Sequence, residues 1–257
     1  MEELPLLHME RAWENTCKVL LGAGIGPLGR FEGYLWKNVE PFHLAKSEIS
    51  GKEVVVTGNY AKGARFISGE EMEQYARRMG RVKLGINDLK DIDSIARAFG
   101  EEICYSGNDI LGKSGMVDSS NRVVDSTFVY NAHDVFYSKY VAYTYLSKYS
   151  EYIFGCESVG KGTRFAVKAF ETYDDSRLFE CVRVYESSDI VYSANLENCQ
   201  SCLFCFNLRS KRRCIGNNEL PGAQFSSLKE KLLEDVRGTL KSKKDAPSIM
   251  EIVGGMP

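Results

Sequence analysis

The sequence has few of the residues that most catalytic and metal sites use. Its three histidines, His8, His43 and His133, lie far apart in the chain, so their spacing indicates neither a zinc triad nor a Ser/His/Asp site. The 33 Lys and Arg residues nearly balance the 35 Asp and Glu residues, which leaves a net charge of −2. No strong overall charge therefore favours nucleic acid or acidic lipid, and any such partner must contact a local patch.

Long hydrophobic runs are also missing. No stretch of about 18 apolar residues could span a membrane, and residues 1–16 carry acidic side chains where a signal peptide needs a basic region and an apolar one. We therefore expect a cytoplasmic protein with no membrane partner. In that compartment the eight cysteines are expected to be thiols or metal ligands rather than a disulfide framework.

One short phrase recurs between residues 126 and 208: two residues, the second usually aromatic, followed by small or polar side chains. The aromatic residues of this phrase follow one another at steps of 13, 11, 11, 14, 13 and 12 residues. They are Tyr130, Tyr143, Phe154, Phe165, Phe179, Tyr192 and Phe204. Repeats this short cannot bury a face alone, so they must stack on their neighbours to fold. The sequence therefore predicts a β-solenoid.

Within each short strand, side chains are expected to alternate between two faces. On that basis Phe154 and Cys156 share one face, and Phe179 and Cys181 form a second copy of it. We expect this aromatic face to point inward, stacked from turn to turn. Four apolar residues do not fit the scheme, because the alternation turns them outward: Ile153, Leu178, Val191 and Leu203.

The segments before the repeats predict helices and a few strands. Apolar residues three or four apart predict helices over residues 6–21 and 27–40. The β-branched run 53–57 predicts a strand, and residues 64–67 a second one. Ser68 and Glu71 form a capping box that opens a helix ending at Met79, and a further helix is expected over residues 88–99. Both of these helices are interpreted as ordinary packing elements.

A C-terminal helix is expected to cover one open end of the stack. Ser227 and Glu230 form a second capping box, and an apolar stripe from Leu228 to Leu240 precedes three lysines. The predicted fold class is thus α+β, a β-solenoid body with N-terminal helices and a C-terminal capping helix. The expected divisions are 1–49 (helical), 50–100 (mixed), 101–216 (solenoid) and 217–257 (capping helix and tail).

The most specific chemical motif is a cysteine cluster. Cys199, Cys202 and Cys205 follow one another at three-residue steps, and Cys214 lies nine residues beyond. Four thiols in a reducing compartment suit zinc or an iron–sulfur cluster. Strand alternation speaks against such a site, because it turns Cys202 away from Cys199 and Cys205. The other interpretation is that these cysteines pack as small core residues, as Cys156 and Cys181 do.

Two glycine motifs suggest nucleotide binding. Residues 22–29 contain G-x-G-x-x-G, the dinucleotide fingerprint, but the residues before it are helical in pattern rather than a strand. Residues 155–163 resemble the phosphate loop, with Gly162 where its hydroxyl residue belongs and Thr163 one position later. Each motif has an alternative interpretation as a turn that binds no ligand. Residues 22–29 would then be a linker between two helices, and residues 155–163 a turn of the solenoid.

A basic run follows the last repeat. Arg209, Lys211, Arg212 and Arg213 lie just after Phe204 and Phe206, and aromatic side chains beside arginines can hold single-stranded nucleic acid. The alternative is a solvated turn, which the slightly acidic overall charge favours.

Residues 198–217 resemble the ending of a group of uncharacterised prokaryotic repeat proteins. In that group, short strands close with a cysteine-rich NLRxKxYCIxN phrase before a helix, and this sequence has Arg213 at the aromatic position. The resemblance covers about the last third of the chain. It implies a repeat fold and carries over neither an activity nor a catalytic residue.

These features favour a non-enzymatic scaffold or binding protein, because stacked turns offer long surfaces and the chain offers no acid, base or nucleophile set. A protein partner or self-association is expected. The alternatives are a zinc or iron–sulfur protein using Cys199, Cys202, Cys205 and Cys214, and a nucleotide-binding enzyme using residues 155–163 or 22–29.

Overall fold

The computed structural model describes residues 3–100 and 102–252, and it opens with helices. Helix α1 spans Glu3–Leu21, as its apolar pattern predicts. The second predicted helix is shorter than expected: a 3-10 helix, η1 (Leu28–Phe31), continues into α2 (Glu32–Trp36). The backbone amide of Leu28 donates to the Glu10 carboxylate at 2.9 Å, so a side chain of α1 caps η1.

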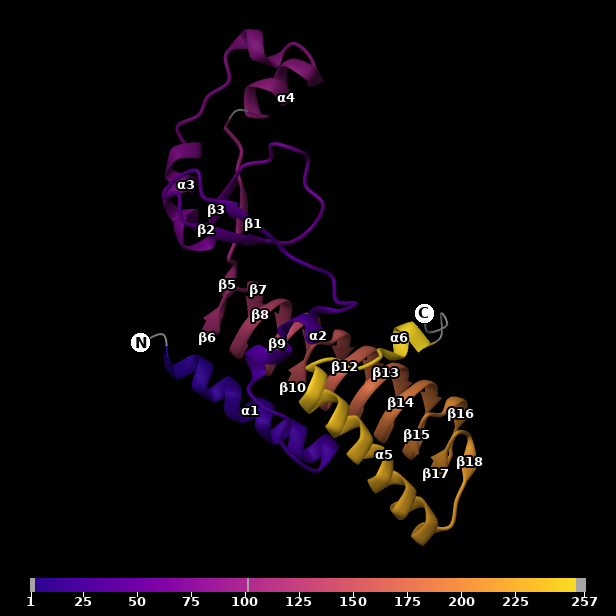
Figure 1. The fold of residues 1–257 in the computed structure, drawn as a ribbon. Helices are drawn as coiled ribbons and strands as arrows, with labels where there is room; N and C mark the ends of the chain where they lie inside the picture. Colours follow the sequence, from indigo (N-terminus) through magenta and orange to yellow (C-terminus); the bar gives the residue numbers. More distant parts are fainter. Residues whose placement is uncertain (1–2, 101, 253–257) are drawn as a thin grey trace.

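Residues 43–107 form an arm that extends away from the rest of the molecule (Figure 1). Strands β1 (His43–Lys46) and β2 (Glu53–Val56) pair antiparallel, while β3 (Phe66–Ser68) and β4 (Tyr105–Gly107) pair parallel. Between β3 and β4 lie η2 (Gly69–Glu71), α3 (Met72–Met79), η3 (Ile86–Leu89) and α4 (Ile92–Gly100). The capping box of Ser68 and Glu71 is confirmed.

A β-solenoid of about nine turns follows the arm. In most turns partner residues are 12 apart, as Thr127 and Lys139 are, and the steps from β5 to β7 and from β10 to β12 are 13 because each contains one extra residue. Its strands, nearly all parallel, are β5 (Ile110–Leu111), β6 (Gly115–Asp118), β7 (Asn121–Val124), β8 (Thr127–Phe136), β9 (Lys139–Lys148), β10 (Glu151–Phe154), β11 (Glu157–Gly160), β12 (Arg164–Tyr173), β13 (Ser176–Tyr185), β14 (Ser188–Glu197), β15 (Gln200–Leu203), β16 (Phe206–Arg209), β17 (Arg212–Ile215) and the antiparallel β18 (Asn218–Glu219).

The backbone of the solenoid repeats every three residues. A left-handed residue with positive φ occurs at every third position from Met116 to Tyr152, and again from Phe165 to Arg213. Two extended residues and one left-handed residue make one side of a four-sided turn of 12 residues. A left-handed non-glycine residue costs roughly 1–2 kcal/mol, so pairing and packing along the stack must offset this cost at each corner.

The three-residue period decides which side chains point inward. The residue after almost every left-handed corner is buried, the exceptions being the half-buried Val117 and Leu208 and the exposed Lys211 near the two ends, and these residues form four columns inside the tube. The first column is Val117, Val129, Val141, Ile153, Ala166, Leu178, Ile190, Cys202 and Cys214; the second is Ser120, Ala132, Thr144, Cys156, Ala169, Cys181, Ser193 and Cys205. The expected alternation of period two is therefore wrong, and Ile153 and Leu178, predicted to face outward, belong to the interior.

Aromatic residues predicted to line the interior instead face the helices. Phe154 and Phe179 lie in a second core with Trp13 of α1 and with Leu233 of α5 (Gly222–Lys243). The same outward row of the solenoid contains Tyr130, Ala142, Phe154, Val167, Phe179, Val191, Leu203 and Ile215. Helices α1 and α5 thus cover one long side of the solenoid, as Figure 1 shows.

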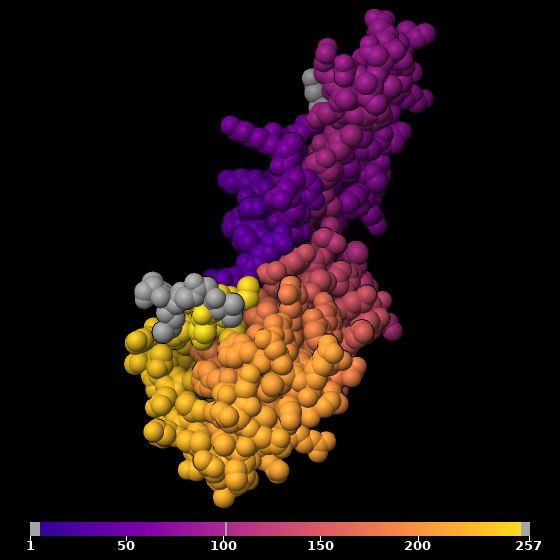
Figure 2. All heavy atoms as spheres, turned by 90° about the vertical axis from the view of Figure 1, so that its right-hand side faces the viewer, coloured from indigo at the N-terminus to yellow at the C-terminus, as the bar shows by residue number. Residues whose placement is uncertain are grey.

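The C-terminal helix is confirmed, but its position and start differ from the prediction. Helix α5 begins at Gly222, so Ser227 and Glu230 lie inside it rather than at its N-cap. It runs along the flank, while the last turn is covered by β18 and by Asn217, whose side-chain amide pairs with both backbone groups of Phe206. A short helix, α6 (Ile249–Ile252), follows. In the space-filling view the arm projects from the body of the molecule, and α5 lies along one side of that body (Figure 2).

Among the described helices, none combines the length and the apolar character that crossing a bilayer requires.

Candidate functional site

Hydroxyl and thiol side chains form hydrogen-bonded ladders inside the solenoid. Ser138 donates from Oγ to the carbonyl of Phe136, two residues back, and accepts a hydrogen bond from the amide of Ser150, one turn on. Ser187 repeats this geometry with Tyr185 and Cys199. A small side chain with one donor and acceptor lone pairs thus satisfies buried backbone groups in the narrow interior.

Asp175 is the exception in this ladder, because it stands where other turns have serine or threonine. Its Oδ1 accepts the amide of Ser187 at 2.8 Å, and its Oδ2 has no hydrogen-bond partner among the described residues. The side chain is 3% exposed, and burial raises the pKa of Asp175 to about 8. At neutral pH the carboxyl group is therefore mainly protonated.

The four cysteines of the predicted metal site all lie inside the tube. Cys199, Cys202, Cys205 and Cys214 are each at most 2% exposed and belong to the interior cluster. Cys202 is not turned away from Cys199 and Cys205, because steps of three residues match the three-residue backbone period. Cys202 and Cys214 are partners in register on adjacent turns.

Each of these thiols donates to a carbonyl two residues back, as the serines do. The Sγ atoms of Cys199 and Cys205 lie 3.3 Å from the carbonyl oxygens of Glu197 and Leu203. Within residues 3–100 and 102–252, no group of three or more His, Cys, Asp or Glu side chains is arranged to hold a metal ion. Zinc or iron–sulfur binding by the four cysteines stays a prediction.

The glycine-rich residues 22–29 do not have the surroundings of a dinucleotide fingerprint. They follow helix α1 rather than a strand, and they lead into the four-residue η1. The amide of Leu28, which would have to face a pyrophosphate, donates to the carboxylate of Glu10. A carboxylate at this position repels an anionic ligand.

Residues 155–163 form a turn of the solenoid, in agreement with the alternative interpretation. Strands β11 and β12 lie on either side of Lys161, and no helix follows. Thr163 donates to the carbonyl of Gly160 at 2.8 Å, as a member of the interior ladder. A phosphate loop requires the helix that is missing from this turn.

The basic run lies on the last turn of the solenoid. Arg209 pairs with Glu197 at 3.0 Å, and Lys211 approaches Glu219 at 3.9 Å. Arg212 and Arg213 belong to β17, the last parallel strand of the stack, and charged side chains on a terminal strand discourage pairing with further strands.

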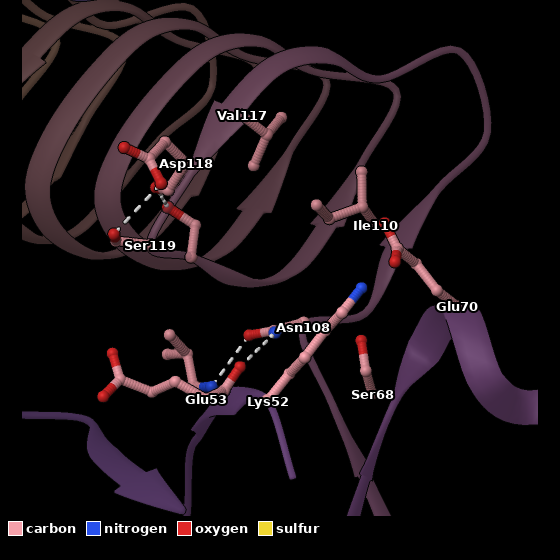
Figure 3. Close-up of a pocket in the computed structure, with 11 residues that line it drawn as sticks. Lys52, Glu53, Ser68, Glu70, Asn108, Ile110, Val117, Asp118 and Ser119 are labelled. Atoms are coloured by element: carbon pink, nitrogen blue, oxygen red, sulfur yellow. Dashed lines mark hydrogen bonds between the residues drawn. The ribbon is translucent and has the colours of Figure 1, made fainter. Parts of the chain in front are cut away.

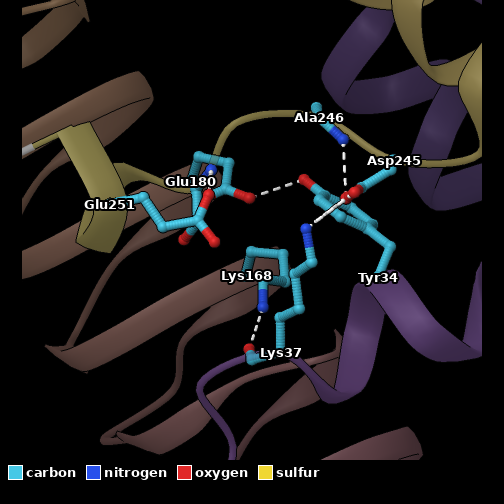
Figure 4. Close-up of polar contacts among 8 residues, drawn as sticks. Tyr34, Lys37, Lys168, Glu180, Asp245, Ala246 and Glu251 are labelled. Atoms are coloured by element: carbon cyan, nitrogen blue, oxygen red, sulfur yellow. Dashed lines mark hydrogen bonds and ion pairs between the residues drawn. The ribbon is translucent and has the colours of Figure 1, made fainter. Parts of the chain in front are cut away.

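A buried polar cluster joins the helices to the solenoid (Figure 4). Glu180 accepts hydrogen bonds from the Tyr34 hydroxyl at 2.6 Å, from Ser248 Oγ at 3.2 Å and from the amide of Ile249 at 2.9 Å. Lys168 donates to the carbonyl of Lys37. Burial raises the pKa of Glu180 to about 7 and lowers that of Lys168 to about 8. Because protein groups satisfy both charges away from solvent, the cluster fastens α2 and α6 to the body.

A polar cleft of about 300 Å³ separates the arm from the first turns (Figure 3). Its lining residues come from both sides: Lys52, Glu53, Val55, Ser68, Glu70 and Asn108 from the arm and the residue that follows it, and Ile110, Val117, Asp118, Ser119 and Ser120 from the solenoid. Asn108 fixes the base of the arm, since its Oδ1 accepts the amide of Val55 at 2.7 Å and its Nδ2 donates to the carbonyl of Glu53 at 3.2 Å.

The outer part of the arm is the candidate functional site. Of the described residues between positions 69 and 106, none is buried, although the segment contains two helices. Ile86 is 87% exposed, Ile92 81% and Leu89 55%. We name these three residues the arm tip. The expectation that both helices are ordinary packing elements is therefore wrong, because α3 and α4 have no core residue of their own.

An apolar groove lies where α5 and the C-terminal segment meet the solenoid. It has a volume of about 340 Å³ and is lined by Tyr192, Phe204, Asp235, Val236, Thr239, Ala246, Pro247 and Ile252. Two of these residues come from the solenoid, three from α5 and three from the C-terminal segment. Only Asp235 among them carries a charge.

Comparison of the chain with protein-family models, curated proteins and solved structures finds no match.

Proposed function

We propose that this protein is a non-enzymatic binding scaffold, in which a rigid β-solenoid body presents the arm tip to another protein chain. The observation that carries the proposal is the exposure of Ile86, Leu89 and Ile92 on a segment without a buried residue. Exposed apolar clusters on a folded chain mark surfaces that bind other proteins.

The construction of the arm supports the proposal. Helix α3 contacts the rest of the arm through polar groups, the ion pair between Arg78 and Glu102 at 2.7 Å and the hydrogen bond from the amide of Cys104 to the Tyr75 hydroxyl at 2.9 Å, and neither α3 nor α4 has a buried residue. An amphipathic helix gains most of its stability by burying its apolar face. A partner that covers this face would supply the missing burial.

The base of the arm supports it in a second way. The Asn121 side chain in β7 donates to Thr57 Oγ1 at 3.0 Å, and Asn108 bridges to β2. Both bonds tie the arm to the first turns of the solenoid. A surface held out on a fixed support loses little conformational entropy when a partner binds, which favours affinity.

Site-specific photo-crosslinking tests the proposal. A photoreactive phenylalanine analogue replaces Ile92 in one sample of the full chain and Lys139, on the solenoid, in a matched control. We expect covalent attachment of one defined protein chain at position 92 only, and loss of that product when Ile86 is also changed to Asp. Equal labelling at both positions, or labelling that survives I86D, overturns the proposal.

A further inference from the structure

The first turn of the solenoid has an uncovered edge beside the polar cleft. Strands β5 and β6 pair with β7 and β8 of the next turn, and no strand among the described residues pairs with their other side. The opposite end of the stack differs, because β18 and the Asn217 side chain cover the last turn. An uncovered strand edge is a surface on which a further strand can pair.

A backbone amide on this edge lacks the acceptor that its equivalents have. Ser119 lines the cleft and stands in the position of Gly155 three turns on. The Gly155 amide donates to the carbonyl of Ala142 in the preceding turn at 3.0 Å. Ser119 belongs to the first turn, and its amide has no hydrogen-bond partner among the described residues. This amide is therefore free to donate to an added strand.

A backbone carbonyl next to this amide lacks a donor in the same way. Ser120 also lines the cleft and stands in the position of Cys156, whose carbonyl accepts the amide of Tyr145 at 3.0 Å. The Ser120 carbonyl has no hydrogen-bond partner in the part of the chain that the structure describes. Further along the stack, the preceding turn thus supplies a carbonyl at Ala142 and an amide three residues further on, at Tyr145. An extended segment that offers the same two groups would complete the edge.

The cleft has the size and the opposite wall that such a segment needs. Its volume of about 300 Å³ admits an extended chain, whereas a helix with its side chains is about 10 Å across. Ser68 is 5% exposed, and Figure 3 shows its hydroxyl directed into the space between the arm and the solenoid. A strand on the solenoid edge would therefore have a polar group of the arm on its other side.

The charges around the cleft indicate which side chain the segment carries. The charged lining groups are the carboxylates of Glu53, Glu70 and Asp118 and the ammonium group of Lys52. Lys52 extends toward Glu70 in Figure 3, away from Glu53 and Asp118. Glu71 and Asp109, each next to a lining residue in the sequence, add two carboxylates, and the other sequence neighbours of the lining residues add no basic side chain. This excess of negative charge favours a lysine or arginine side chain.

We infer that the cleft binds an extended peptide segment of a partner protein, and that this segment carries a lysine or arginine side chain. The segment adds a strand to the first turn: one of its carbonyls accepts the Ser119 amide, and an amide three residues further on donates to the Ser120 carbonyl. Main-chain pairing then supplies affinity, and the basic side chain beside Glu53 and Asp118 supplies specificity. The inference goes beyond the proposed function, because the cleft and the arm tip are separate surfaces.

A phage-displayed library of random heptapeptides, selected on the full chain, tests the inference. We expect the selected peptides to share a lysine or arginine, and fluorescein-labelled synthetic versions to bind in a fluorescence anisotropy assay. Glu53→Gln combined with Asp118→Asn should weaken this binding about tenfold, because each exposed charge pair contributes up to about fivefold. Glu186→Gln, at an exposed corner on another turn, is the matched control and should leave affinity unchanged. Ile92→Asp, at the arm tip, should also leave it unchanged.

Backbone-modified peptides test the strand pairing itself. N-methylation of each peptide amide in turn should lower affinity about tenfold at the position that donates to the Ser120 carbonyl, because it removes that donor. Hydrogen–deuterium exchange should slow at the Ser119 amide when the unmodified peptide is bound. A library that yields no binding peptide overturns the inference, and so do selected peptides without a basic residue. Peptides that bind equally after every single N-methylation, or that protect the arm tip instead of Ser119, also overturn it.

Discussion

Replacing Asp175 with serine should remove a pH dependence of stability that this carboxyl group imposes. Every other turn from Ser114 to Cys199 has a hydroxyl or thiol at this interior position. In the Asp175→Ser chain, the introduced hydroxyl would accept the amide of Ser187 and donate to the carbonyl of Tyr173, in the same geometry as Ser187 one turn on. This variant is therefore expected to keep the fold and to lose only the titration.

The magnitude follows from the pKa of Asp175, which burial raises from 3.8 to about 8. Between these values the folded protein binds one more proton than the unfolded chain, so the free energy of unfolding falls as pH rises. Its slope is about 1 kcal/mol per pH unit from one group, or roughly 2–3 kcal/mol between pH 5 and pH 7. Glu180 adds a slope of the same sign below pH 7, and this contribution is common to both proteins.

Urea unfolding at a series of pH values measures the difference between wild-type and D175S chains. We expect the stability of D175S relative to wild type to increase steadily from about pH 4 to pH 8. If the wild-type and D175S curves stay parallel over this range, the carboxyl group titrates normally and the argument for a protonated acid in the ladder fails.

Three further outcomes are expected. Gly155→Ala should destabilise by several kcal/mol, because its Cβ would lie 2.8 Å from the Leu35 side chain, whereas Gly162→Ala, also at positive φ but in open space, should lose only about 1 kcal/mol by thermal unfolding. Anaerobically purified protein should carry no stoichiometric zinc or iron by elemental analysis; metal that is released by Cys202→Ser would instead favour the four-cysteine site. Thermal-shift assays with ATP, GTP, NAD and FAD should show no stabilisation, and a shift of about 2.7 kcal/mol at 100 times the dissociation constant would favour the nucleotide-binding alternative.

The solenoid could be predicted from the sequence, because stacked turns of similar length place similar residues at nearly even intervals along the chain. The recurring aromatic residues mark successive turns, and the steps of 11 to 14 residues scatter around the true step of 12. They scatter because the aromatic residues occupy neighbouring positions: Phe154 and Phe179 face the helices, while Tyr143 and Phe204 are themselves left-handed corners. The division into segments at 49, 100 and 216 stays a prediction.

The direction of the side chains could not be predicted, because the backbone breaks the rule on which the prediction depends. Alternation between two faces holds for a strand of uniformly extended residues, and a left-handed residue at every third position replaces it with a period of three. Asn and Asp, which adopt this conformation most readily, occupy only some of these corners, such as Asn131 and Asp174, and Tyr, Phe, Arg and Leu residues occupy many of the others. No single residue type therefore marks the corners in the sequence.

The exposure of the arm tip could not be predicted from the sequence, for a different reason. The amphipathic pattern of residues 88–99 predicts that one face will be buried, and the sequence does not say whether the covering surface belongs to the same chain. The helices α1 and α5 have the same kind of pattern, and the solenoid covers them through Phe154, Phe179 and Leu203.

The narrow interior of the solenoid explains why the remaining features occur together. A turn of 12 residues with a corner at every third leaves room inside for small and aliphatic side chains only, so the aromatic residues must pack outside. An exposed row of apolar and aromatic residues along the solenoid would promote aggregation, and α1 and α5 cover it. Because α1 and α5 both pack against this side of the solenoid, neither covers the arm. The apolar side chains at positions 86, 89 and 92 thus have no covering element within the described part of the chain, and this exposure is the observation on which the proposed binding function rests.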